Sequence, residues 1–308
     1  RDVAPSRGLG DVYKRQIPIC SSYLRAFGFS KEPLYASIIG NVINFCLNAF
    51  FLFVLHKGVA GVATATVISR IINLVIVVLL GAVLVKAKQH PERESNRAVM
   101  GQIIRIGLPS ACETAIYNVS MTLVIRFLNQ MDAQGLNVTA RSYTMQITNF
   151  SYCVGAALAQ ANAIMTGWHI GAKEYDACDR GTKKAAVIGV IVAVILETVF
   201  TLCSGWIMQL FSKDPQMVSL VGKLLAIDIV LEIGRVTNLV YGQALKTSGD
   251  AVFPVVMGAC FMILCSVGGT YLFGIRLGLL AVGAYIGMTG DECVRAVGMY
   301  LRLSLIHI

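Results

Sequence analysis

Long apolar blocks separated by short polar segments dominate this chain. Three blocks hold no Asp, Glu, Lys or Arg, three more are interrupted by a single charge, and the last two carry several charges. A helix needs about 20 apolar residues to cross the core of a bilayer, and each block has about this length. The pattern therefore predicts an all-α, polytopic membrane protein with about eight spans, at residues 33–55, 58–85, 107–125, 142–168, 185–212, 220–245, 251–275 and 277–301.

Composition agrees with this reading. The chain is 56% hydrophobic and only 14% charged, whereas a soluble domain carries about 25% charged residues. Buried helices of a large soluble protein are the alternative, but such helices should rarely exceed about 18 uncharged residues. The nine cysteines form no CxxC pair and no Cys/His spacing typical of zinc, so we interpret them as apolar packing residues.

The two ends of the chain differ from the rest. Residues 1–16 are polar and adjoin an apolar run, 17–29, that is too short to span, while residues 303–308 follow a natural stop at Arg302. We expect both flanks to be foreign sequence, with a native amphipathic tail as the alternative. Because the first flank inflates the net charge of +9, we expect no nucleic-acid partner.

Basic residues gather in every second connection between the predicted spans. Because Lys and Arg are retained in the cytoplasm, these connections are expected to face inward and the protein to be multi-pass in the plasma membrane. The alternate connections carry fewer basic residues, among them Lys57, Lys213 and Arg276. The inward set comprises Arg25, Lys31, Lys86, Lys88, Arg93, Arg97, Arg105, Lys173, Arg180, Lys183, Lys184 and Lys246.

A short motif occurs twice. Residues 24–33 and 245–254 both read L-[KR]-x-x-G-x-x-x-x-P. In each copy we expect the glycine to end a helix in a left-handed turn and the proline to begin the next helix. Transporters are often built from repeats, and two units of this size imply a parent of roughly 440 residues, with parallel repeats related by an axis along the membrane normal.

Several segments, in order and spacing, resemble the multidrug and toxic compound extrusion (MATE) transporters over about residues 17–302. The segment 41–48 with 58–66 is similar to the family's fifth and sixth helices, and Gly107-Leu-Pro-Ser to the start of its seventh. Residues 160–163 with 171–174 are similar to the eighth helix and its exit loop, residues 245–254 to the junction of the tenth and eleventh helices, and residues 287–295 to the twelfth helix.

The resemblance implies twelve helices in two six-helix lobes. Residues 97–302 would then form the complete C-terminal lobe, and residues 17–96 the end of the N-terminal lobe, with a stub, two helices and the inter-lobe loop. We expect the first helices of the N-terminal lobe, and an acidic residue that the family carries there, to lie outside this chain. The family also implies a monomer in membrane lipid, without a cofactor, that exchanges Na⁺ or H⁺ for small cationic or amphipathic molecules.

Ionisable groups within spans are costly in lipid and are therefore functional candidates. Asp228, Glu232 and Arg235 share one helix face by their i,i+3, i,i+4 and i,i+7 spacing. A second group comprises Asp291, Glu292 and Arg295, where the i,i+4 pair Asp291–Arg295 is expected to be satisfied and the group to lie near a membrane surface. Glu113 lies one turn inside its span, and Glu197, alone in its span, is expected at the rim of the lobe. Structural ion pairs between helices are the alternative for each.

The resemblance adds three neutral residues, Asn44, Asn48 and Thr66, because Asn and Thr at matching positions of the family surround the first-helix acid. Polar packing between helices is the alternative. The position of the tenth-helix acid of some subgroups falls near Arg235 here. We therefore expect Glu113 to pair with Arg235, Glu232 or Asp228 to be the exchangeable site, and Na⁺ to bind near Glu113 and Glu232.

These features favour a secondary antiporter. A flippase for a lipid-linked precursor is the alternative within the superfamily, and a cavity rich in Arg and Lys would favour it because its substrate is anionic. A membrane-embedded enzyme is disfavoured, since the sequence has no HExxH, GxSxG or GxxxxGK[ST] motif.

Overall fold

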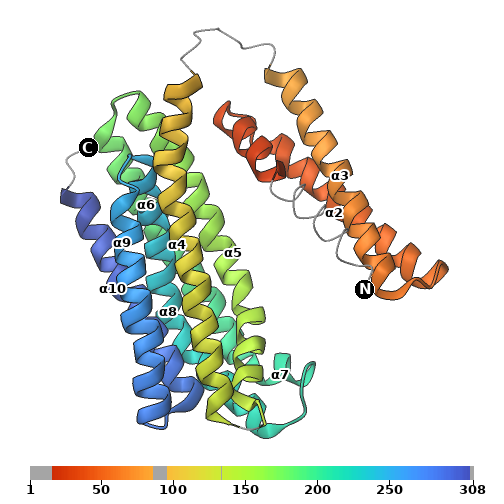
Figure 1. Cartoon of the computed structure of the whole chain (residues 1–308), viewed down its shortest axis with the longest axis vertical. Helices are drawn as coiled ribbons and strands as arrows, with labels where there is room; N and C mark the ends of the chain where they lie inside the picture. The colour runs from red at the N-terminus through yellow and green to blue at the C-terminus, as the bar shows by residue number, and fades with distance from the viewer. Residues whose placement is uncertain (1–15, 86–95, 133, 306–308) are drawn as a thin grey trace. The chain divides into compact units, whose positions relative to one another are not determined.

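The computed structural model describes residues 16–85, 96–132 and 134–305, and within them it contains helices and turns but no strand, as predicted. The chain divides into two compact units, the first ending at Arg93 and the second beginning at Glu94 (Figure 1). Each unit is described by itself. The flanks predicted to be foreign lie outside the described residues, except residue 16 and residues 303–305.

The first unit is a helical hairpin. Residues 16–26 are helical, and α2 (Lys31–Ala49) continues into the π-helical turn η1 (Phe50–Val54) before α3 (Gly58–Val85) returns alongside it. The helices approach closely where a Cβ on Gly40 would lie 2.8 Å from the amide nitrogen of Asn73. Gly40 therefore sets the spacing of this hairpin.

Both copies of the repeated motif adopt the expected turn. Gly28 and Gly249 have φ of 88° and 94°, which is the left-handed region. The same hydrogen bond closes each turn: the amides of Phe29 and Asp250 donate to the carbonyls of Leu24 and Leu245, respectively, at 3.0 Å in both. The prolines lie at the third residue of the following helices, so the match in sequence is also a match in backbone structure.

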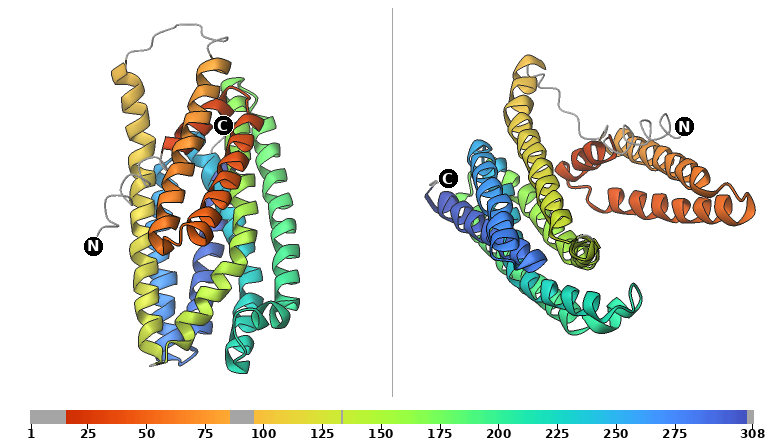
Figure 2. Two further views of the ribbon diagram at one scale, coloured as in Figure 1. Left: turned by 90° about the vertical axis from the view of Figure 1, so that its right-hand side faces the viewer. Right: turned by 60° about the horizontal axis from the view of Figure 1, so that its bottom comes forward.

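The second unit is a bundle of long helices that run side by side (Figures 1 and 2). A shorter helix, α7 (Ser204–Gln209), separates two of them, and π-helical turns extend another. In chain order the long helices are α4 (Asn96–Met131), α5 (Leu136–Gly171), α6 (Tyr175–Leu202), α8 (Pro215–Thr247), α9 (Val252–Phe261) with η3 (Met262–Val267) and η4 (Thr270–Arg276), and α10 (Leu280–Leu305).

Two helices differ in length from the predicted spans. The span predicted at 107–125 is the middle of α4, which continues in both directions past charged residues, because a charge ends an apolar run without ending a helix. The span predicted at 185–212 stops at Leu202, and α7 follows as a separate helix. Ser204 and Gly205, which favour helix ends over helix interiors, lie at this break.

The helix α8 is the centre of the second unit and packs against α5, α6 and α10. Gly234 permits the contact with α10, because a Cβ there would lie 2.8 Å from the backbone nitrogen of Cys293. Two apolar clusters lie along α8. The first ends at Leu231 and the second begins at Val236, so Glu232 and Arg235 lie between them.

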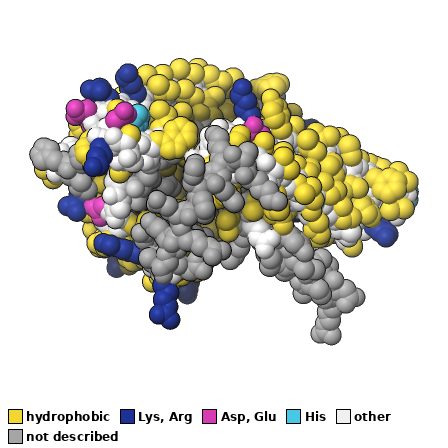
Figure 3. Space-filling view, turned by 90° about the horizontal axis from the view of Figure 1, so that it is seen from above, with side chains coloured by type: hydrophobic (Ala, Val, Ile, Leu, Met, Phe, Trp, Pro, Cys, Tyr) yellow, Lys and Arg dark blue, Asp and Glu magenta, His cyan; other side chains and the backbone are white. Residues whose placement is uncertain are grey.

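The outer surfaces of the helices are apolar. Four described helices are long and apolar enough to cross a membrane. In the most apolar 18 residues of each helix, at most 28% are buried inside the protein. Figure 3 shows apolar side chains over much of the face it views, with Lys and Arg side chains at the edge of the second unit. The four remaining long helices, α4, α5, α8 and α10, bury some polar residues among apolar ones and leave large apolar side chains exposed. The four helices that are long and apolar enough to cross a membrane are Lys31–Val54, Gly58–Val85, Tyr175–Leu202 and Val252–Arg276.

Candidate functional site

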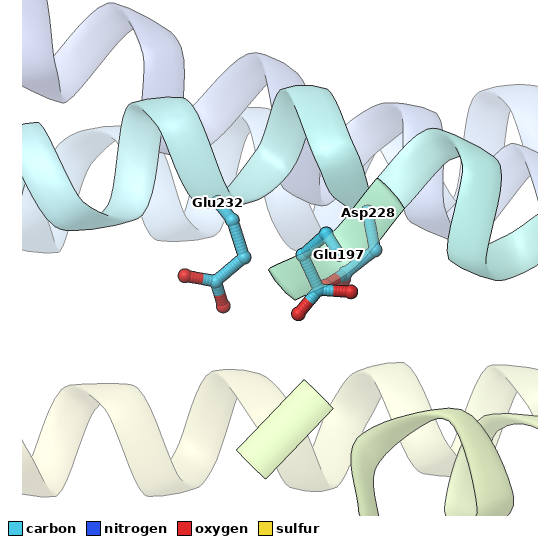
Figure 4. A group of neighbouring side chains, drawn as sticks. All are labelled: Glu197, Asp228 and Glu232. Carbon is cyan, nitrogen blue, oxygen red and sulfur yellow. The ribbon is translucent and has the colours of Figure 1, made fainter. Parts of the chain in front are cut away.

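Three buried carboxylates meet in the second unit. Asp228 and Glu232 lie on the same face of α8, as their spacing predicts, and Glu197 reaches them from α6. One oxygen atom from each lies within 4.8 Å of the others. Figure 4 shows the three carboxyl groups on the same side of α8. Their relative exposure is 1% or less, so no bulk water separates the charges.

The burial of Glu197 corrects the expectation that this residue lies at the rim of the lobe. Small residues mark the buried face of α6 at intervals of three or four, and Glu197 is the next position in that register. This stripe is the signal in the sequence that could have placed Glu197 inside the bundle. The buried residues of α6 are Cys178, Thr182, Ala186, Gly189, Ala193 and Glu197.

The carboxylate cluster has few hydrogen-bond donors. Both oxygens of Glu197, and one each of Asp228 and Glu232, are buried without a partner among the described residues. The single cation in contact among those residues is Arg235, whose guanidinium donates to Glu232. Three carboxylates at this distance in a dry interior repel each other strongly, so they cannot all be charged unless a cation or proton joins them.

A second group of charges lies beside this cluster on α10 and is satisfied. Arg295 donates to both oxygens of Asp291, at 2.8 and 3.0 Å, and forms an ion pair with Glu292 at 3.0 Å. Glu292 also accepts from Asn238 of α8 at 2.9 Å and lies 3.9 Å from Arg235. The predicted Asp291–Arg295 pair is therefore confirmed. Asp291 and Arg295 are buried and the group lies in the middle of α10, which gives no support to the expectation that it lies near a membrane surface.

Glu113 has a different partner from the one expected. The ammonium group of Lys246, in the last turn of α8, lies 2.6 Å from the Glu113 carboxylate. The predicted pairing of Glu113 with Arg235 is therefore wrong, because Arg235 is held by Glu232. Glu113 is not among the residues whose carboxylates could share a cation with Glu232. Lys246, which the sequence pattern places in a loop, reaches inward because its long side chain extends along the helix.

A cavity of about 820 Å³ lies in the second unit between α4, α5, α8, η3 and α10. Asp228 lines this cavity, whereas Glu197 and Glu232 lie behind it, so Asp228 connects the cavity with the carboxylate cluster. Five methionines supply adaptable apolar surface: Met121, Met145, Met262, Met288 and Met299. A pocket of this size accommodates a drug-sized molecule.

One cation of the cavity is missed by reasoning from the sequence. Arg141 lies on α5, is 6% exposed and lines the cavity. It immediately precedes the uncharged run 142–168, so the sequence pattern places it at the end of a span. The described structure shows that the cavity reaches Arg141, within the first two turns of α5.

The neutral residues of the first unit form a small polar contact. The amide of Asn44 donates to Ser69 of α3 at 2.9 Å, and the amide of Asn48 donates to Asn44 at 3.1 Å. The hydroxyl of Thr66 donates back to the carbonyl of Val62 on its own helix. Asn44 and Asn48 thus come together, while the hydrogen bond of the Thr66 hydroxyl stays within its own helix.

Comparison with known proteins gives a consistent family. A family model described as MatE matches residues 109–272. The uncharacterized transporter YisQ of Bacillus subtilis is 32% identical over 92% of this chain and 63% of its own length. Human multidrug and toxin extrusion protein 1 is 22% identical over 92% of this chain and 50% of its own. The chain therefore spans less than two thirds of the length of these curated relatives.

Solved structures share the fold. A crystal structure of MATE in the bent conformation has a TM-score of 0.84 at 19% identity, covering 98% of this chain and 68% of that chain. The MATE transporter ClbM in complex with Rb⁺ has a TM-score of 0.80 at 17% identity, covering 95% and 64%. These matches confirm the resemblance drawn from the sequence motifs and the all-α membrane fold. The chain belongs to the MatE family, the multidrug and toxic compound extrusion transporters.

Proposed function

We propose that this chain forms the ion-coupled part of a secondary antiporter that exports cationic or amphipathic compounds in exchange for Na⁺ or H⁺. The observation that carries the proposal is the buried group Glu197, Asp228 and Glu232, which has three carboxylates, unpartnered oxygens and one arginine. Such a group changes its net charge when a cation or proton arrives, and a coupled carrier needs this change. The MATE transporter ClbM, which shares the fold, forms a complex with Rb⁺, and this is consistent with a monovalent cation.

The arrangement suggests how the ion and the substrate would compete. Asp228 lines the cavity and also belongs to the cluster. A cationic substrate beside Asp228 and an ion held by all three acids would need the same negative charge, so that occupancy by one disfavours the other. Arg235 lowers the affinity for cations, because it already neutralises part of the charge, and thereby permits release.

Several further expectations belong to this proposal. Residues 97–302 would be the complete C-terminal lobe and residues 17–96 the end of the N-terminal lobe of a monomeric plasma-membrane protein whose basic loops face the cytoplasm. The flippase alternative gains no support from Arg235, Arg295 and Lys246, since acidic partners neutralise all three. Asn44 and Asn48 would contribute polar contacts in the N-terminal lobe.

The test is drug accumulation in cells that express the complete reading frame containing this chain, with the Na⁺ and H⁺ gradients collapsed separately. Collapse of one gradient should raise accumulation, and Glu197→Gln should reduce gradient-driven efflux at least about tenfold. Asp176→Asn, an exposed acid in the first turn of the same helix, is the matched control. Efflux that is indifferent to both gradients, or equal in both variants, would overturn the proposal.

A further inference from the structure

The other cations that line the cavity of the second unit are neutralised by nearby acids. Arg235 contacts Glu232, Arg295 contacts Asp291, and Lys246 contacts Glu113. Arg141 differs, since it takes part in none of the ion pairs found among the described residues. Its hydrogen bond goes to the sulfur of Met121 at 3.5 Å, which is a weak, uncharged acceptor. Its Nε is buried without any partner in the described part of the chain.

An arginine in this position is energetically unfavourable by itself. It keeps its proton in proteins, so it cannot escape burial by becoming neutral. Removing a charge from water costs several kcal/mol, on the order of the net stability of a domain, unless an anion compensates. Because the residue is only 6% exposed and still faces the cavity, the compensating anion would have to enter through the cavity.

The neighbouring residues indicate what kind of molecule carries that anion. Met145, Thr148 and Tyr152 lie one, two and three turns beyond Arg141 on α5, and all line the same cavity. This face therefore begins with a fixed positive charge and continues with a methionine, a hydroxyl and an aromatic ring. Such a sequence of groups suits an amphipathic molecule with an acidic group at one end.

We infer that Arg141 binds an anionic group, such as a carboxylate, of the transported molecule, so that the substrates include zwitterionic and anionic amphiphiles. The guanidinium fork would bind both oxygens of the acidic group while Asp228 receives any cationic group. This inference rests on the proposed function, because it assigns a substrate class to the same cavity. It changes the expected class, which the sequence limited to cationic or amphipathic compounds.

The test is equilibrium binding to the purified protein in phosphatidylcholine nanodiscs, with no ion gradient. Rhodamine B and its ethyl ester share one ring system, but the free acid is a zwitterion and the ester is a cation. Fluorescence anisotropy should show the free acid binding at least about tenfold more tightly, the factor expected of one charged hydrogen-bonded contact. Arg141→Met should abolish this preference by weakening the free acid, and it should not weaken the cationic ester, because removing a positive charge relieves repulsion of a cation. Arg141→Lys should retain part of the preference.

The matched control is Arg126→Met, which removes an exposed arginine near the C-terminal end of α4, the end that precedes the start of α5. It should keep the preference of the wild type. Equal affinities of the wild type for the two dyes, or a preference that survives Arg141→Met, would overturn the inference. If Arg141→Met does not fold, Arg141→Lys provides the test. An equal loss of affinity for both dyes in Arg141→Lys would overturn the inference as well.

Two further arms separate this inference from neighbouring explanations. If nanodiscs that contain phosphatidylglycerol abolish the preference, Arg141 binds a lipid headgroup and the inference about substrates fails. Gradient-driven efflux of the ester measures ion coupling without Arg141. Failure of the proposed function would appear in that efflux experiment, and failure of this inference would appear in the binding experiment.

Discussion

At the scale of residues, the interior of the second unit combines satisfied and unsatisfied charges on neighbouring parts of α6, α8 and α10. Arg295 is bound by Asp291 and Glu292, an arrangement that fixes side chains and makes them poor candidates for exchange. Glu197 has no such partner among the described residues, although it is equally buried. The difference supports the proposal that the second group exchanges cations while the first group has a structural role.

This contrast predicts an unusual stability change. Glu197→Gln keeps the shape of the side chain and removes one of three crowded negative charges, so the purified protein should gain on the order of 1–3 kcal/mol in buffer without Na⁺. Thermal unfolding in choline chloride measures the gain. The difference in stability between the variant and the wild type should narrow in NaCl if Na⁺ is the coupling ion, or on acidification if the ion is a proton. A variant less stable than the wild type in every buffer would contradict this reasoning.

A residue outside the membrane-spanning segments gives a pH prediction. Burial alone would raise the pKa of Asp132, but hydrogen bonds from Asn137 and from the amides of Leu136 and Gly135 lower it below its usual value of 3.8. A carboxyl with a depressed pKa stabilises the folded state above that value and loses this contribution as the pH falls through the depressed pKa. Asp132 is partly exposed, so solvent screening keeps the contribution small.

Asp132→Asn should therefore lower the thermal unfolding temperature slightly at pH 7, and the difference from the wild type should shrink as the pH drops below about 4. Asp214→Asn is a useful comparison, because Asp214 accepts a hydrogen bond from the Gln216 amide at the start of α8. If the difference in unfolding temperature between Asp132→Asn and the wild type grows on acidification, the predicted direction of the pH dependence is wrong.

At the scale of elements, the helices are largely predictable from the sequence because apolar length is the quantity that lipid selects. Long-range partners are not predictable in the same way. Lys246 looks like a loop residue since it follows an apolar run, yet its side chain turns back to α4. The π-helical turns η3 and η4 have no distinguishing composition, so nothing in the apolar run indicates them. The burial of Glu197 is visible in principle, through the small-residue stripe of α6.

Close helix contact at Gly234 gives an element-scale prediction. A methyl group there would meet the backbone of α10 at 2.8 Å, so Gly234→Ala should separate α8 from α10 and cost about 1–3 kcal/mol. Gly222→Ala is the control on the same helix, because its nearest neighbour, the Ser204 hydroxyl, lies at an ordinary 3.5 Å. This control should leave the free energy of unfolding unchanged or raise it by up to about 1 kcal/mol, because alanine has the higher helix propensity. Chemical denaturation of both variants measures the difference, and equal effects would contradict the packing argument.

At the scale of the whole molecule, the distribution of Lys and Arg predicts how the protein lies in the membrane. The turn between α5 and α6, with Lys173, belongs to the basic set, whereas the turn before α8, with Lys213, does not. Membrane-impermeant thiol reagents applied to intact cells should therefore label Lys213→Cys and spare Ala172→Cys in a cysteine-free background. Labelling of Ala172→Cys alone would reverse the orientation.

The π-helical turns η3 (Met262–Val267) and η4 (Thr270–Arg276) affect how this chain should be aligned with its relatives. Each π-turn contains about one residue more than an α-turn, so the side chains that follow each of them are rotated by roughly 100° more from where an uninterrupted α-helix would place them. A gap-free alignment to a relative with a plain α-helix would therefore compare lipid-facing positions with cavity-facing positions beyond Met262. Substitution patterns at Ser266 and Thr270 become meaningful only when the alignment allows for the extra residue.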